Sequence, residues 1–332
     1  MFNKSMATVA AAALLALSAM PAKALDEITV AYFLEWPMPF QYAKVNGTYD
    51  EEMGVKVNWV SFDTGTAMSA AMASGDVQIA VSQGVPPFVV ATSAGQDLQI
   101  VDVAVSYADN DNCVVKSELE IDKTSAGELA GKKVGVPIGT AAHYGFLKQM
   151  DHFGVDISTM EIVDMAPPDG AAAFAQGNLD MVCGWGGSLR RMLEHGNVLI
   201  TGAEKTELGI LVFDVTSAPA SFVAENPDLL AKFLKVTADA NAQWASGDKS
   251  MLPVIAKDAG MDEAATAETI ATFVFPTVGD QLDGKWLGGN AQAFMKGVAD
   301  VFVEAGSIDK ARDTYEDAVN IGPLSTLKGS GS

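Results

Sequence analysis

Two decamers decide the fold of this chain: AAMASGDVQI at residues 70–79 and AAFAQGNLDM at residues 172–181. Each decamer combines the end of a small-residue helix, a glycine that stops the helix, and the start of a strand. The repeat therefore predicts two lobes built on one helix–glycine–strand plan. The segments after the two predicted strands, residues 82–84 and 184–186, should lie outside the carboxyl ends of the strands, where α/β sheets bind ligands.

Strand and helix patterns alternate outward from the repeat. β-branched and aromatic runs predict further strands at residues 28–33, 55–62 and 132–137. The pattern predicts an α/β fold with a mostly parallel sheet in each lobe and a ligand cleft between the lobes. The chain of 332 residues is long for one domain. We expect lobe 1 over residues 25–115 plus 216–325, lobe 2 over 116–215, and a flexible tail over 326–332.

The N-terminus has the pattern of an export signal. Lys4 precedes an apolar run at residues 7–17, which is too short to span a membrane. Ala22, Lys23 and Ala24 then give the small-x-small pattern that signal peptidase cleaves. We therefore expect a signal peptide over residues 1–24, cleavage near Ala24–Leu25, and a protein of the periplasm.

The chain is strongly acidic, with 42 Asp and Glu against 21 Lys and Arg, a net charge of −21. Removal of residues 1–24 leaves 19 basic residues and a net charge of −23. A field of this sign repels phosphate backbones, so nucleic acid is excluded as a partner. An anionic ligand would have to be held by local dipoles. We expect a monomer that uses no cofactor.

The chain has two cysteines, Cys113 and Cys183. An even number of cysteines in an oxidising compartment favours a disulfide, and two buried free thiols are the alternative. The three histidines, His143, His152 and His195, have no metal-ligand spacing with the cysteines, so no metal site is expected.

A candidate anion site begins at Gly139 and Thr140, where a strand ends and a helix running to about Met150 begins. The first N–H groups of a helix are unpaired and its N-terminus is the positive end of the dipole, which suits an oxyanion. Thr140 could add a hydroxyl donor. Its alternative role is that of an N-cap alone.

Several of these segments together resemble a known family: VAY at 30–32, FDTG at 62–65, ASGDVQI at 73–79, GKKVGVP at 131–137, TAAHY at 140–144 and FDV at 213–215. In this order, over about residues 28–225, the chain resembles the periplasmic binding proteins of taurine, sulfonate, nitrate and thiamine-precursor ABC importers. The resemblance implies a two-lobed type II periplasmic binding protein that closes over its ligand and delivers it to a membrane permease. It also implies taurine or a related small sulfonate as the ligand.

The resemblance also places residues around the cleft. A sulfonate would take N–H donors near residues 82–84 and 140–141, and an ammonium group would need a carboxylate. Asp214 is the first candidate for that carboxylate, and Glu35, beside Trp36 in the loop after the first strand, is the second. For each acid the alternative is a solvated loop charge. The resemblance assigns to the cleft Ser82, Gln83, Gly84, Thr140, Ala141, His143, Tyr144, Trp185 and Asp214.

The sequence departs from the family at the cationic end of the pocket. The family's first-loop glutamate stands two residues later than Glu35, and Thr216 replaces an aromatic residue. A second ligand class therefore stays open, an amine such as choline, betaine or a thiamine precursor. Its cage would be Tyr32, Trp36, Tyr144 and Trp185, although Tyr32 also fits the core.

Two further alternatives concern charged and reactive side chains. Arg190 or Arg191 could contact an anion, but both also fit the exposed face of a helix. The wider family includes a thiamine-pyrimidine synthase that uses a histidine, and His143 fits that role. The cysteine cluster of that enzyme is absent, as are phosphate-loop and nucleophile-elbow motifs. We therefore expect a binding protein and no enzymatic activity.

Overall fold

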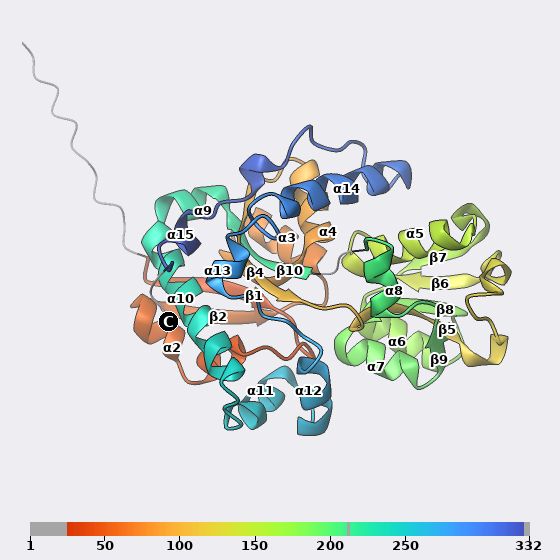
Figure 1. Ribbon diagram of the computed structural model, residues 1–332, viewed down its shortest axis with the longest axis horizontal. Coiled ribbons are helices and arrows are strands. Elements are labelled where there is room, and N and C mark those ends of the chain that lie inside the picture. The colour runs from red at the N-terminus through yellow and green to blue at the C-terminus, as the bar shows by residue number, and fades with distance from the viewer. Residues whose placement is uncertain (1–24, 211–212, 329–332) are drawn as a thin grey trace, which may run out of the picture.

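A computed structural model describes residues 25–210 and 213–328. Two five-stranded sheets, each packed between helices, form two lobes that lie side by side (Figure 1). This arrangement confirms the predicted two-lobed α/β fold. The predicted signal peptide and residues 329–332 of the predicted tail lie outside the described residues.

The first sheet has the strand order β2–β1–β3–β10–β4. Strand β1 pairs in parallel with β2 and β3, while β10 runs antiparallel to both β3 and β4. Its strands are β1 (Glu27–Tyr32), β2 (Lys56–Ser61), β3 (Ile79–Gly84), β4 (Leu98–Ser106) and β10 (Phe213–Pro219).

The second sheet repeats this plan in the order β7–β6–β8–β5–β9. Strand β6 is parallel to β7 and β8, and β5 runs antiparallel to β8 and β9. Its strands are β5 (Asp111–Lys116), β6 (Lys133–Val136), β7 (Glu161–Asp164), β8 (Met181–Trp185) and β9 (Gly196–Val198). In each sheet, therefore, one antiparallel strand lies beside the third parallel strand.

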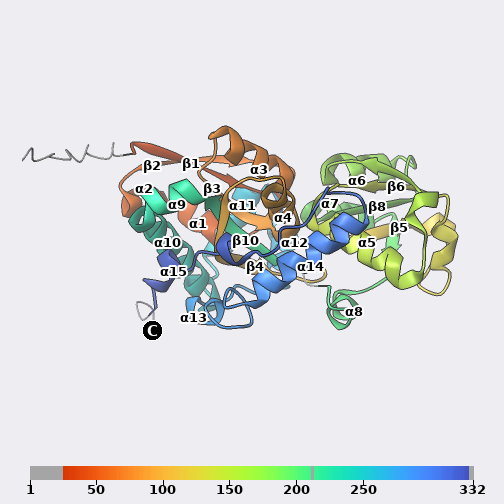
Figure 2. The ribbon, with the colours of Figure 1, turned by 90° about the horizontal axis from the view of Figure 1, so that it is seen from above.

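The helices of the first lobe come from both ends of the chain. They are α1 (Phe40–Val45), α2 (Thr48–Met53), α3 (Gly65–Ser74), α4 (Val85–Ser93), α9 (Ala220–Glu225), α10 (Pro227–Ala245), α11 (Met251–Ala259), α12 (Glu263–Ile270), α13 (Val278–Gln281), α14 (Asn290–Glu304) and α15 (Gly322–Ser325). The second lobe has α5 (Ala141–Phe153), α6 (Pro167–Ala175), α7 (Gly186–Leu193) and α8 (Gly202–Glu207). Helix α14 packs against α4 and α5 and so contacts both lobes (Figure 2). In the described part of the chain, no helix combines the length and apolarity needed to cross a bilayer.

The sequence repeat forms the same structure twice. Helix α3 ends at Gly75 and leads to β3, and α6 is followed by Gly177 and β8. Both glycines have left-handed backbone angles, with φ of 85° and 81°, which a residue with a Cβ rarely adopts. Both strands take the third position in their sheets, so the repeat marks equivalent places in the two lobes.

The crossings between the sheets differ from the predicted boundaries at residues 115 and 215. Strand β5, which begins at Asp111, belongs to the second sheet, and β10 belongs to the first sheet from Phe213 onward. The chain therefore leaves the first sheet after Ser106 and returns between α8 and β10. The pattern of apolar residues could not locate these crossings, because β5 and β10 are buried on both faces and either sheet could contain them.

Cys113 and Cys183 form a disulfide across the antiparallel pair of β5 and β8. The two residues face each other in the register and are 1% exposed. This confirms the bridge over the alternative of two free thiols. The bond fixes the strand that enters the second lobe to the strand that ends at the cleft.

Loss of this disulfide should destabilise the protein. The bridge closes a separation of 70 residues, for which loop closure predicts about 4 kcal/mol of the free energy of unfolding. We expect Cys113→Ala/Cys183→Ala to unfold at clearly lower urea concentration than the oxidised wild type. Wild-type protein unfolded with a reductant is the matched control and should behave like the variant. Equal urea midpoints for all three samples would contradict this account.

Candidate functional site

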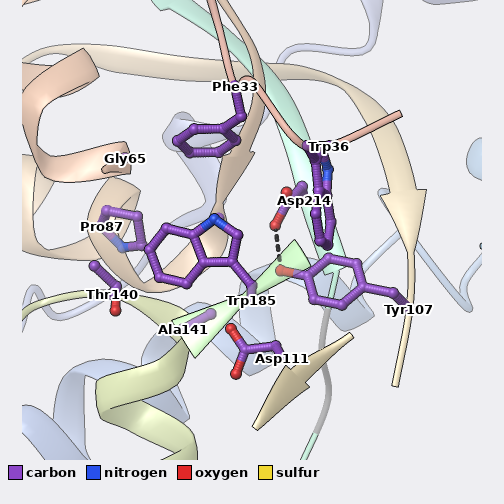
Figure 3. Close-up of a pocket in the computed structure, with 11 residues that line it drawn as sticks. Phe33, Trp36, Gly65, Pro87, Tyr107, Asp111, Thr140, Ala141, Trp185 and Asp214 are labelled. Carbon is purple, nitrogen blue, oxygen red and sulfur yellow. Dashed lines mark hydrogen bonds between the residues drawn. The ribbon is translucent and has the colours of Figure 1, made fainter. Parts of the chain in front are cut away.

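A cavity lies between the lobes, with a volume of about 20 Å³ for the centres of water-sized molecules. This volume is far below the roughly 300–1,000 Å³ of most ligand pockets, so the walls of the two lobes lie close together around the cavity. Both lobes contribute to its lining, as Figure 3 shows. The lining residues are Phe33, Trp36, Gly65, Gly84, Pro87, Tyr107, Asp111, Thr140, Ala141, Trp185 and Asp214.

The strand order explains why two carboxylates face this cavity. An antiparallel strand begins at the edge of the sheet where its parallel neighbours end. Asp214, near the start of β10, accordingly pairs with Gly84 at the end of β3. Asp111, the first residue of β5, pairs with Trp185 at the end of β8. Each sheet therefore places one acid beside the carboxyl end of its third parallel strand.

Four helices begin at the cavity. Gly65 is the first residue of α3, Gly84 is the N-cap of α4, Thr140 is the N-cap of α5, and Trp185 is the N-cap of α7. The first N–H groups of a helix have no partner within the helix, and the dipole adds positive potential there. No Lys or Arg is among the described residues that line the cavity. The first turns of α3 and α5 can therefore bind an oxyanion without a basic side chain. Helix α4 contributes less, because Pro86 and Pro87 have no N–H, and the first two N–H groups of α7 already donate to backbone oxygens.

The hydroxyl group of Thr140 is already used within the protein. It donates to the backbone oxygen of Pro137 at 2.6 Å and accepts from the N–H of His143 at 3.4 Å. Thr140 is thus an N-cap, and its proton does not point at a ligand. Of the two roles predicted for the Thr140 hydroxyl, only the N-cap role is present. Any donors to a ligand at this helix end would be the backbone N–H groups.

Asp214 lies in a buried network of hydrogen bonds. Tyr107 donates its O–H to Oδ1 and Ser82 donates its O–H to Oδ2, both at 2.7 Å. Trp36 donates its indole N–H to the Ser82 oxygen at 2.8 Å. Ser82 adopts a left-handed backbone (φ 61°), a strained conformation of the kind found at functional sites. Burial raises the pKa of Asp214 to about 7, although the two hydrogen bonds act in the opposite direction.

Asp111 is the second acid of the cavity and is 4% exposed. Burial raises its pKa to about 7 against the attraction of Lys205. The ammonium group of Lys205 donates to the backbone oxygen of Asp111. The cavity therefore combines helix N-termini with two carboxyl groups that ionise near neutral pH.

Aromatic side chains form much of the cavity wall. Trp36 meets Tyr107 edge to face, with ring centroids 4.8 Å apart, and Phe33 packs against Trp185 at 5.9 Å. Figure 3 shows the indole of Trp185 reaching between Phe33 and Asp111. Such walls exclude water, which strengthens electrostatic interactions inside the cavity.

Several predicted site residues lie outside this lining. The Ser82 hydroxyl bonds to the Asp214 carboxylate. The amide of Gln83 donates to the Gly65 backbone oxygen and to Ser69, and its oxygen accepts from Ser217. Gln83 thus fixes the first turn of α3 to the sheet. The prediction that residues 82–84 follow the strand was wrong, because β3 extends to Gly84 and includes Ser82 and Gln83, whose side chains bond within the first lobe.

His143 and Tyr144 pack against α14 and do not line the cavity. The His143 ring stacks on Phe302, and its Nδ1 accepts from the N–H of Gly139. Burial lowers the pKa of His143 to about 4. Tyr144 packs on Phe294 and Tyr32 on Phe40, so the predicted aromatic cage does not form. Of its four members, only Trp36 and Trp185 line the cavity.

Glu35 also lies outside the cavity and joins the lobes instead. Its carboxylate accepts two hydrogen bonds from the guanidinium of Arg191 on α7, at 2.6 and 2.9 Å. Its backbone oxygen accepts from the N–H of Gly187 at 3.2 Å. Gly186 permits this approach, because a Cβ there would lie 2.6 Å from the Glu35 oxygen. Glu35 is thus neither an ammonium ligand nor a solvated charge, and Arg191 forms an interlobe ion pair.

Sequence reasoning missed five lining residues: Phe33, Gly65, Pro87, Tyr107 and Asp111. Tyr107 and Asp111 flank the first crossing between lobes, which was predicted too late in the chain. A correct boundary would have placed both at the cleft. Across the described ranges, no group of three or more His, Cys, Asp or Glu residues could hold a metal ion.

Comparison with known proteins adds sequence evidence to this geometry. Residues 37–249 match the family model described as NMT1/THI5 like. The chain is 30% identical over 232 residues to the taurine-binding periplasmic protein of Escherichia coli K12, and the match covers 70% of each chain.

Solved structures share the fold at lower identity. The periplasmic aliphatic sulphonate binding protein SsuA from Escherichia coli superposes with a TM-score of 0.68 at 21% identity, over 87% of this chain and 96% of that one. The desulfurization enzyme DSZB superposes with a TM-score of 0.62 at 13% identity, over 91% and 99%. The fold thus occurs in binding proteins and in an enzyme. The family model and the 30% identity together show that this chain belongs to the NMT1/THI5-like family.

Proposed function

We propose that the protein is a periplasmic substrate-binding protein of an ABC importer and that it binds a small aminosulfonate, with taurine as the first candidate. The main support is one property of the cavity. It combines the N-termini of α3 and α5 with buried carboxylates and has no basic side chain among its described lining residues. A zwitterion could place its negative group at the helix N-termini and its positive group at the carboxylates. A simple anion would bring its negative charge next to carboxylates and offer them no cation.

The sulfonate group would take the backbone N–H groups at the starts of the helices, with Thr140 and Ala141 as the main candidates. These donors are fixed before the ligand arrives, since Thr140 is held by Pro137 and Gln83 anchors the start of α3. Preformed donors lower the entropy lost on binding. The ammonium group would pair with Asp214, whose position is set by Tyr107 and Ser82.

Closure of the lobes would bury the ligand, as in other two-lobed binding proteins that close by hinge motion. The ion pair of Glu35 and Arg191 supports the closed arrangement. Both residues line a groove that shares Phe33 and Trp185 with the cavity. The closed form, as a monomer, would then be the form that a membrane permease recognises. Export is supported by the signal pattern at residues 1–24.

A quaternary ammonium ligand is the second candidate, because Phe33, Trp36, Tyr107 and Trp185 line the cavity. Choline or glycine betaine could use these rings. The quaternary nitrogen of either ligand has no N–H group, so it cannot donate a hydrogen bond to the carboxylates. Catalysis has less support, since both cysteines of the chain are joined in the disulfide and are not available as thiol nucleophiles.

Taurine should stabilise the purified protein against heat more than isethionate, which has a hydroxyl in place of the amine. At a concentration of 100 times Kd the stabilisation should be about 2.7 kcal/mol. In Asp214→Asn we expect taurine binding to weaken by at least tenfold and to approach that of isethionate. Thermal shift and calorimetry with both ligands and glycine betaine test this expectation. Stabilisation by glycine betaine alone would contradict the sulfonate assignment.

Taurine affinity should increase with pH. Burial raises the pKa of Asp214 and of Asp111 to about 7, so below pH 7 the empty site is protonated and an ammonium ligand must displace a proton. Each displaced proton weakens binding by up to about tenfold per pH unit below 7, and above pH 7 this dependence disappears. We expect Kd to be at least tenfold larger at pH 5.5 than at pH 8. A Kd that is constant over this range would count against ammonium recognition by these acids.

Arg191→Ala should weaken ligand binding although Arg191 does not line the cavity. The pair with Glu35 is partly exposed, so its loss should cost about 0.2–1 kcal/mol, or up to about fivefold in Kd. Arg190→Ala is the matched control, because Arg190 contacts Asp262 only at 3.8 Å. We expect small-angle scattering to show a more open ligand-free form for Arg191→Ala. Identical affinity and scattering for the two variants would refute the role of the ion pair.

A further inference from the structure

Asp111 has a carboxylate oxygen that no group of the protein satisfies. The side chain lines the cavity, the residue is 4% exposed, and Oδ2 is buried with no hydrogen-bond partner among the described residues. An unsatisfied buried acceptor costs about 1–3 kcal/mol, and more when it is charged. The site therefore needs a donor that the protein does not supply.

Neighbouring groups do not provide this donor. Lys205 donates to the backbone oxygen of Asp111 and not to its carboxylate. Tyr107 gives its only proton to Asp214. Asp214 is different in this respect, because both of its oxygens accept hydrogen bonds from side chains. Of the two acids in the cavity, Asp111 is the one whose acceptor is free for a ligand.

The two acids belong to different lobes. Asp111 opens β5 in the second sheet and Asp214 lies in β10 of the first. Both acids line the same cavity, and burial, with a smaller contribution from the charge of Asp111, raises the pKa of Asp214. Two ionised carboxylates in a buried space repel each other and favour separation of the lobes. A cation between them would remove this repulsion and connect the lobes.

We propose that Asp111 is the specificity-determining carboxylate of the site and that, with Asp214, it selects ligands with a primary ammonium group. A primary ammonium has three N–H donors and can serve both acids at once. A quaternary ammonium has none and leaves Asp111 unsatisfied, and a hydroxyl has a single proton. This inference rests on the proposed function and specifies the cationic end of its ligand.

The test is a calorimetric series in which the ammonium group loses its donors stepwise. The ligands are taurine, its N-methyl and N,N,N-trimethyl derivatives, and isethionate. We expect the wild type to bind the trimethyl derivative at least tenfold more weakly than taurine. In Asp111→Asn, taurine should weaken by at least tenfold while the trimethyl derivative and isethionate change less than threefold, so that the preference disappears. Asp151→Asn, which removes an exposed charge of the same lobe, is the matched control and should behave like the wild type.

Two results would overturn the inference. One is a folded Asp111→Asn variant, with the thermal midpoint of the wild type, that keeps both its taurine affinity and its preference over the trimethyl derivative. The other is a wild type that binds both ligands equally well, which decides the question even if the variant does not fold. If the wild type binds no taurine, the proposed function fails, and ethanolamine tests Asp111 separately. Loss of ethanolamine binding in Asp111→Asn would support the inference, and unchanged or absent binding would contradict it.

Discussion

Two carboxylates buried where the lobes meet, Asp111 and Asp214, place the strongest constraint on this structure. A buried ionised acid is unfavourable unless donors or a cation compensate it. Tyr107, Ser82 and Trp36 form a chain of donors that compensates Asp214. Asp111 has an oxygen without such a donor. We therefore infer that Asp214 is held in place by the protein itself, whereas Asp111 depends on the ligand for a donor.

Sheet topology is the reason that both acids are present. In each lobe an antiparallel strand lies beside the third parallel strand and starts at the edge where helices begin. The same edge therefore presents carboxylates and positive helix ends within one cavity. In a chain with a net charge of −21, these local dipoles are what can attract an anionic group. The arrangement would suit the proposed ligand, which carries both charges, and the ion pair of Glu35 and Arg191 joins the two lobes.

Sequence reasoning located most of this site but not its details. The repeat around Gly75 and Gly177 predicted two equivalent lobes and pointed to Gly84 and Trp185, and the family resemblance pointed to Asp214; all three line the cavity. It failed where side-chain direction matters: Glu35 turns to the other lobe and His143 turns into the packing against α14. Asp111 was missed because a strand buried on both faces gives no sign of the sheet to which it belongs. The sheet that contains β5 is decided by pairing with strands far away in the sequence, and a local pattern of residues does not carry this information.

A crystal structure of the taurine complex would show whether the ammonium group of the ligand contacts both buried acids. We expect the sulfonate at the backbone N–H groups that begin at Ala141, near Gly65 and Gly84. We expect the ammonium nitrogen within hydrogen-bonding distance of both Asp111 and Asp214. A ligand bound in the reverse orientation, or outside the cavity lined by Trp36 and Trp185, would show that these acids do not recognise the ammonium group.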